Sequence, residues 1–163
     1  MKTFIYLILS MFVFFTISCK SEDRDIPPTI FQESMEVSEE KPETYFKVGP
    51  YDYDMWGFRL VKKNKNGEYE NNEYVPISKE MKGKAASVVN VSDDEEAIVF
   101  CENGKLKKIV FNAITIEKTG KGKYEVKLNS NKKSQESQIY DFSFICSHGG
   151  NSATIYINKE QIK

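Results

Sequence analysis

The most suggestive group of chemical side chains is a run of alternating aromatic and acidic residues at positions 51–56, Tyr-Asp-Tyr-Asp-Met-Trp. Sugar-binding sites stack an aromatic ring on the apolar side of a sugar and use carboxylates to accept hydrogen bonds from its hydroxyls. In an extended segment the two tyrosines share one side and the two aspartates the other. Two tyrosines of the next hairpin would complete such a surface. The candidate ligand-binding residues are therefore Tyr51, Asp52, Tyr53, Asp54, Tyr69 and Tyr74.

A structural interpretation of the same run competes with this one. Trp56 starts a second alternation in which Phe58 and Leu60 occupy the same face. Large aromatic side chains are mostly buried, so we expect Trp56 to lie in the core with them. Tyr51 and Tyr53 would then either bind a ligand or merely cover the edge of a sheet.

Catalysis has little support in the sequence. His148 is the single histidine, so a Ser-His-Asp or Cys-His arrangement would have to include it. It stands beside Gly149-Gly150, which indicates a turn, and this glycine pair lacks the motif context of a phosphate-binding loop. We therefore expect a protein that is not an enzyme, with no catalytic residue and no cofactor.

Metal and nucleic-acid binding are also disfavoured. With one His and three Cys, a zinc site is hard to build. The acidic run at 93–96 lacks EF-hand spacing and is interpreted as a solvated loop that hinders edge pairing. Lys and Arg total 23 against 24 Asp and Glu, so the chain lacks the basic excess of a nucleic-acid-binding protein. We predict no bound metal and no nucleic-acid partner.

The N-terminus has the pattern of a cleaved export signal. Lys2 precedes residues 3–18, which are uncharged and mostly apolar. Such a stretch spans about 24 Å as a helix, less than the ~30 Å hydrocarbon core of a bilayer. Thr16-Ile17-Ser18-Cys19 resembles a bacterial lipobox, which implies cleavage before Cys19 and lipid attachment to it. The alternative is an ordinary secretory signal with a coincidental cysteine.

The residues after Cys19 predict a tether and a location. Positions 20–25 are polar and mostly charged, and Pro27-Pro28 follow, so residues 19–28 form a lipidated, flexible linker between the signal peptide at 1–18 and a domain at 29–163. The acidic residues within 20–25, directly after Cys19, resemble the surface-export signals of Bacteroidetes-type lipoproteins. That resemblance implies anchoring in the outer membrane and exposure at the cell surface. A periplasm-facing anchor is the alternative.

Two cysteines remain once Cys19 is lipidated. Cys101 and Cys146 would lie in an oxidising compartment, where a disulfide is chemically allowed. Cys146 shares a strand face with Phe142 and Phe144, which indicates burial. The two residues are therefore either a bridge or two separate buried thiols, since a free cysteine packs as a small apolar side chain.

The chain after residue 30 alternates with a period of two rather than 3.6, which indicates strands. Asn66-Gly67 and Asn103-Gly104 are typical of type I′ hairpin turns. Positions 78–87 form the one weak helical window, and Gly149-Gly150-Asn151 is expected to turn the chain. About eight or nine strands at this spacing predict an all-β sandwich or barrel.

The pattern of the C-terminal third resembles the BACON domain, an immunoglobulin-like sandwich of bacterial lipoproteins. The resemblance rests on residues 114–117, 124–128 and 149–157. Trp56 resembles the central tryptophan of the family, and residues 64–84 correspond to an insertion relative to it. It implies an immunoglobulin-like β-sandwich of about 7–9 antiparallel strands that binds carbohydrate or mucin without catalysis. A protein-binding lipoprotein, such as a surface-complex subunit or an immunity protein, is the alternative function.

Overall fold

The computed structural model describes residues 26–63, 68–69, 74–92, 95–129 and 138–158. Five predictions lie outside these ranges in whole or in large part: the signal peptide at 1–18, lipidated Cys19, the linker residues 20–25, the Asn66-Gly67 turn, and the acidic pair Asp93 and Asp94.

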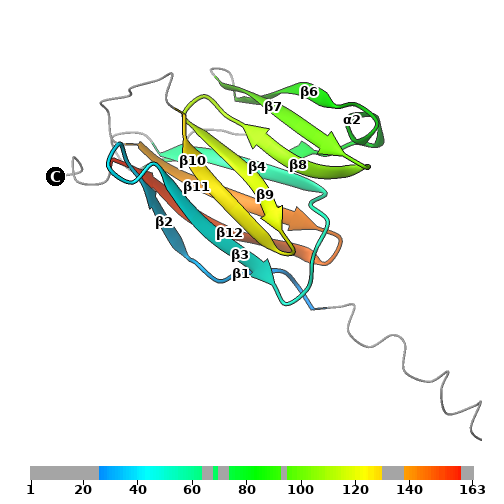
Figure 1. The fold of residues 1–163 in the computed structure, drawn as a ribbon, viewed down its shortest axis with the longest axis horizontal. Coiled ribbons are helices and arrows are strands. Elements are labelled where there is room, and N and C mark those ends of the chain that lie inside the picture. The colour runs from blue at the N-terminus through cyan, green and yellow to red at the C-terminus, as the bar shows by residue number, and fades with distance from the viewer. Residues whose placement is uncertain (1–25, 64–67, 70–73, 93–94, 130–137, 159–163) are drawn as a thin grey trace, which may run out of the picture.

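The described residues form two sheets that face each other (Figure 1). The first sheet has seven strands, in the order β1 (Thr29–Ile30), β3 (Glu43–Gly49), β10 (Lys123–Leu128), β9 (Ile114–Gly120), β8 (Lys105–Val110), β7 (Glu95–Glu102) and β6 (Ala86–Ser92). The second has five strands, in the order β2 (Ser34–Val37), β12 (Gly149–Ile157), β11 (Gln138–Cys146), β4 (Gly57–Lys63) and β5 (Val75–Pro76). The predicted all-β, immunoglobulin-like sandwich is confirmed.

The two sheets contain more strands than the eight or nine predicted, because three strands are short and a fourth shows no clear alternation of apolar and polar residues. Strands β1, β2 and β5 contain two to four residues each. Strand β6 falls partly in the expected helical window, where the helix is only α2 (Lys79–Lys82), capped by the Ser78 hydroxyl. The valines of β6 favour a strand. One pairing, β2 with β12, is parallel rather than antiparallel, with Thr154 opposite Ser34 and Ile157 opposite Val37.

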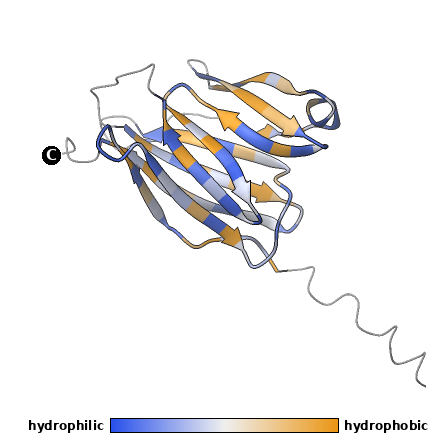
Figure 2. Ribbon diagram, in the orientation of Figure 1, coloured by the Kyte–Doolittle hydropathy of each residue, from blue (hydrophilic) through white to orange (hydrophobic). Residues whose placement is uncertain are grey.

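The core lies between the sheets and is formed by buried apolar side chains of both. Hydrophobic and hydrophilic residues alternate along many of the strands (Figure 2). Phe46 of β3 stacks on Tyr124 of β10 with ring centroids 5.0 Å apart. The same Phe46 ring meets Phe142 of β11 across the interface at 6.0 Å. Phe58 and Phe144 of the second sheet are fully buried beside them. These aromatic contacts tie the two layers into one core.

Two predicted turns have different outcomes. Asn103 and Gly104 both have positive φ, 52° and 73°, so the predicted type I′ turn between β7 and β8 is confirmed. The expected turn at Gly149-Gly150-Asn151 is wrong: the register pairs Cys146 with Gly149, so the chain turns at Ser147-His148. Both glycines already belong to β12, where Gly149 takes the positive φ of 115° next to the turn.

Candidate functional site

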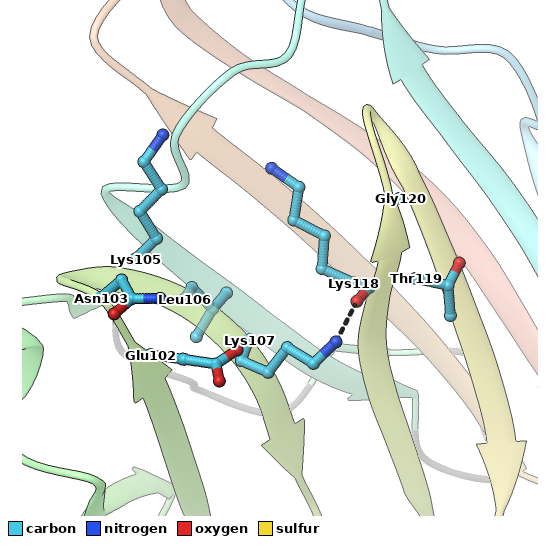
Figure 3. Close-up of a pocket in the computed structure, with 8 residues that line it drawn as sticks. All are labelled: Glu102, Asn103, Lys105, Leu106, Lys107, Lys118, Thr119 and Gly120. Carbon is cyan, nitrogen blue, oxygen red and sulfur yellow. Dashed lines mark hydrogen bonds between the residues drawn. The ribbon is translucent and has the colours of Figure 1, made fainter.

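The seven-stranded sheet opens at one end between β8 and β9. These strands pair only from Lys108 with Glu117 to Val110 with Thr115, although β8 starts at Lys105 and β9 continues to Gly120. The diverging ends enclose a groove of about 300 Å³ (Figure 3). Its lining residues are Glu102, Asn103, Lys105, Leu106, Lys107, Lys118, Thr119 and Gly120.

Three of the eight lining residues are lysines, Lys105, Lys107 and Lys118. Lys107 spans the opening, because its amine donates to the Lys118 carbonyl oxygen at 3.0 Å (Figure 3). The same amine lies 3.6 Å from the Glu117 carboxylate. Lys105 and Lys118 extend to the same side of the strands in this view. The amines of Lys105 and Lys118 form ion pairs with Asp54 and Asp52 of the 51–56 segment.

Asp52 binds the more buried of these two lysines. Its Oδ1 lies 2.7 Å from the Lys118 amine and also accepts the backbone N–H of Gly122 at 2.9 Å. Burial alone raises the pKa of the Asp52 carboxyl, but the hydrogen bonds from Lys118 and Gly122 outweigh it and hold the pKa below its ordinary value. Asp52 therefore stays ionised and pins the 51–56 segment to the end of β9.

Asp54 makes the second, looser pair. Its carboxylate lies 3.8 Å from the Lys105 amine, and the two side chains are 40% and 62% exposed. Both predicted aspartates thus pair with lysines that line the groove, and neither lines it itself. Alternating ammonium donors and carboxylate acceptors match the hydroxyls of a polyol, which both donate and accept hydrogen bonds.

The predicted tyrosine pair of this segment divides between surface and core. Tyr53 is only 8% exposed and donates its hydroxyl hydrogen to the Ile26 carbonyl at 2.6 Å, so it does not belong to a ligand surface. Tyr51 is 37% exposed, and its ring meets that of Tyr53 edge to face at 5.9 Å. Of the two, Tyr51 alone is available to a ligand.

The expectation that Trp56 lies in the core is wrong, since it is 52% exposed. Its backbone is held on both sides, because its N–H donates to Ile145 O and its own carbonyl accepts from the Ile77 N–H, each at 2.8 Å. In β4 the first buried side chain with bulk is Phe58, which follows the buried Gly57, and Met55 is the buried residue on the other side of Trp56. The indole is thereby left at the end of the sandwich.

The two hairpin tyrosines lie at opposite ends of β4. Tyr74 covers the face of Gly57, where any Cβ would meet its ring, and donates to Trp56 O at 3.3 Å. Tyr69 lies beside Lys63, whose amine is 4.7 Å from the ring centroid. Because a strand rises about 3.3 Å per residue, the two ends of β4 are about 20 Å apart. Tyr74 therefore neighbours the 51–56 segment, and Tyr69 does not.

The two cysteines are free thiols in separate sheets. Cys101 belongs to β7 of the first sheet and Cys146 to β11 of the second, and no bridge joins them. Burial raises the pKa of both thiols. Of the two arrangements the sequence leaves open, the structure has the separate thiols.

The lysines of the groove have no signature in the sequence. Lys105, Lys107 and Lys118 occupy strands where charged residues alternate with apolar ones, as many solvent-facing lysines do. The divergence of β8 from β9 is what brings them together.

Among the residues that the structure describes, His148 and the acidic side chains form no cluster that resembles a reactive centre. The imidazole lies 6.1 Å from the Tyr53 ring, centroid to centroid. The described ranges bring no three His, Cys, Asp or Glu side chains into a cluster suited to a metal ion. Within the same residues, no helix has the length and apolarity needed to cross a membrane.

No protein-family profile matches this chain, and no curated protein matches it in sequence. Among solved structures, the chain is similar to a protein from Bacteroides thetaiotaomicron determined by NMR. The two share 10% sequence identity with a TM-score of 0.41, over 86% of this chain and 96% of that one.

Proposed function

We propose that this protein is a non-catalytic binding module that recognises carbohydrate through the groove between β8 and β9 and the adjoining 51–56 segment. The observation that carries the proposal is the pairing of Asp52 with Lys118 and of Asp54 with Lys105 beside exposed aromatic rings. Each pair offers donors and acceptors within a few ångströms, as vicinal hydroxyls require. The resemblance to BACON domains favours the same class of ligand.

The aromatic part of the site would come from Trp56 and Tyr51. Trp56 is two residues beyond Asp54, hence within about 7 Å along the chain. Its exposed indole offers an apolar face to the C–H side of a sugar ring, and Tyr51 offers a second, smaller one. A ligand seated this way contacts rings and charges from one short segment, which Asp52 holds in place.

The proposal includes a lipid anchor in a bacterial outer membrane. The lipobox-like sequence ending at Cys19 supports attachment, and the charged residues at 20–25 support display at the cell surface. Metabolic labelling with a fatty acid tests this directly. Label should enter the wild-type protein and be lost in Cys19→Ala, and surface proteolysis of intact cells distinguishes the outward from the periplasmic face.

A protein ligand is the second candidate, and one observation favours it. Trp56 and Tyr74 are 52% and 46% exposed and lie side by side, joined by the Tyr74 hydroxyl bond to the Trp56 carbonyl. Tryptophan and tyrosine are enriched at the energetic centres of protein interfaces. A partner protein would cover this pair without entering the lysine groove.

A glycan-array screen with residues 21–163, which include all of both sheets, tests the carbohydrate proposal. A hit should lose about 5- to 30-fold in affinity in Lys105→Ala and in Trp56→Ala, because each variant removes a contact of roughly 1–2 kcal/mol. Tyr69→Ala is the matched control, since this exposed tyrosine lies at the far end of β4. A folded protein without hits, or hits unaffected by both variants, would overturn the assignment. Binding to cells that depends on Trp56 and not on Lys105 would favour the protein ligand.

A further inference from the structure

The last strand of the seven-stranded sheet has an open and uncharged edge. Strand β6 pairs with β7 on one side, and no described strand pairs with its other side. Its seven residues, Ala-Ser-Val-Val-Asn-Val-Ser, contain no Lys, Glu or Pro. Edge strands usually carry such residues because an unguarded edge pairs with another strand.

The hydrogen-bond register shows which backbone groups this edge presents. The N–H of Cys101 donates to the Ala85 carbonyl at 3.3 Å, so Ala85 and Cys101 form a hydrogen-bonded pair just before the start of β6. Hydrogen-bonded and non-hydrogen-bonded pairs alternate along an antiparallel ladder. The N–H and C=O groups directed away from β7 therefore belong to Ala86, Val88 and Asn90.

The same residues border an exposed apolar surface. Val88 is 63% exposed and lies opposite Ile98 of β7, which is 39% exposed and lies opposite Val110 of β8. Apolar residues are concentrated along β6 and β7 in Figure 2. Strand addition at this edge would extend the sheet and cover Val88 at once.

We propose that β6 pairs with β6 of a second copy of this chain, antiparallel and about a two-fold axis at Val88. The outward backbone groups match in this register, with Val88 opposite Val88 of the partner subunit and Ala86 opposite Asn90 of the partner subunit. Each of these pairs exchanges both of its backbone hydrogen bonds. The proposal is independent of the carbohydrate groove, which β6 does not line.

The charges at the two ends of β6 favour an antiparallel pairing, and they favour a second copy of this chain as the partner at the open edge. Lys84 precedes the strand, and Glu96, opposite Asn90 on β7, lies at its other end; both are exposed. Antiparallel pairing brings Lys84 of each copy toward the acidic end of the other, whereas parallel pairing would align like charges. An isologous contact of this kind closes on itself. The opposite edge of the sheet is β1, with only two residues, so no second pairing follows.

Sedimentation velocity and light scattering of residues 21–163, from micromolar to millimolar concentration, test the pairing. The wild type should show a monomer–dimer equilibrium, and Val88→Lys should be monomeric with an unchanged circular dichroism spectrum and melting temperature. Phe31→Lys is the matched control, since Phe31 is an equally exposed apolar residue, at 61%, outside β6. It should dimerise as the wild type does.

Two further measurements locate the contact. Hydrogen exchange at Val88 should slow in the dimer, because its N–H points to the open edge. Lys84→Glu should weaken dimerisation by about 3- to 10-fold, and adding Glu96→Lys should restore it, as expected for surface charge pairs. A monomer at every concentration overturns the proposal. So does a dimer that survives Val88→Lys, or one in which the Val88 amide exchanges freely.

Discussion

The Asp52 carboxylate and the Lys118 amine, 2.7 Å apart, join the segment that crosses between the two sheets to the end of β9. Residues 50–56 leave β3 of the seven-stranded sheet and enter β4 of the five-stranded one. The same Oδ1 atom of Asp52 accepts the Gly122 N–H from the turn between β9 and β10. One side chain thus fixes the crossing segment, and with it the positions of Asp54 and Trp56 beside the groove.

Replacing Asp52 should cost more stability than replacing its neighbour. Asp52→Asn leaves Lys118, only 17% exposed, without its carboxylate. We expect the free energy of unfolding to fall by about 1–2 kcal/mol, because the charge-assisted bond to Lys118 is lost while the amide oxygen of Asn can still accept the Gly122 N–H. Asp54→Asn is the control, because its pair with Lys105 is exposed and longer, and a change within about 0.5 kcal/mol is expected. Urea denaturation measures both, and equal losses would contradict the structural role of Asp52.

The pH dependence of stability should reveal the same carboxylate. The folded-state pKa of Asp52 is lowered, from an ordinary value of 3.8, so its ion pair stabilises the protein fully above that value. The contribution is lost as the pH falls through the folded-state pKa. The difference in unfolding free energy between wild type and Asp52→Asn should therefore be constant near neutral pH and shrink below 3.8. A difference that grows toward acid pH would contradict the assignment.

Two turn glycines with similar backbone angles should respond differently to alanine. Gly122 has φ +61°, and a Cβ there would overlap the Val48 carbonyl oxygen, a backbone atom. Gly104 has φ +73° and nothing within 4 Å. Gly104→Ala should cost about 1 kcal/mol, the left-handed penalty alone. Gly122→Ala should cost at least about 2 kcal/mol, because backbone displacement adds to that penalty. Thermal unfolding of the two variants makes the comparison, and equal costs would argue against the close approach of Val48.

Reducing agents should leave the protein's stability unchanged. Cys101 and Cys146 are free and lie in different sheets. A bridge closing the 45-residue interval between them would contribute about 4 kcal/mol in the chain-entropy account. The melting temperature with and without dithiothreitol should coincide, and mass spectrometry after alkylation should find both thiols modified once the protein is unfolded. A melting temperature that falls by many degrees on reduction would show that the two form a bridge.

The predictable parts of this structure are those set by neighbouring residues. Alternation over 124–128 and 140–146 identified β10 and β11, because one face of each strand must be buried. The Asn103-Gly104 turn was predictable because few residues adopt two successive positive φ angles. Strand β6 escaped prediction because both of its faces carry valine, so no clean alternation marks it.

Of the candidate site, only the two aspartates, Asp52 and Asp54, were predictable from the sequence. The aspartates of the 51–56 run do lie together, since their spacing places both on one side of an extended segment. Tyr53 and Trp56 exchanged their expected environments, because burial there depends on where β4 begins against Ile145 rather than on the alternation itself. The lysines that complete the site come from two other strands.

Periodicity and turn chemistry act between residues close along the chain, so the all-β class, the β7–β8 turn and most strand positions follow from the amino-acid sequence. Which residues form a site depends on the folded arrangement of distant strands. The separation of β8 from β9, the approach of Asp52 to Lys118 and the open edge of β6 depend on how distant strands pair and diverge. Such pairings are set by the packing of two whole sheets around one core, which no local pattern records.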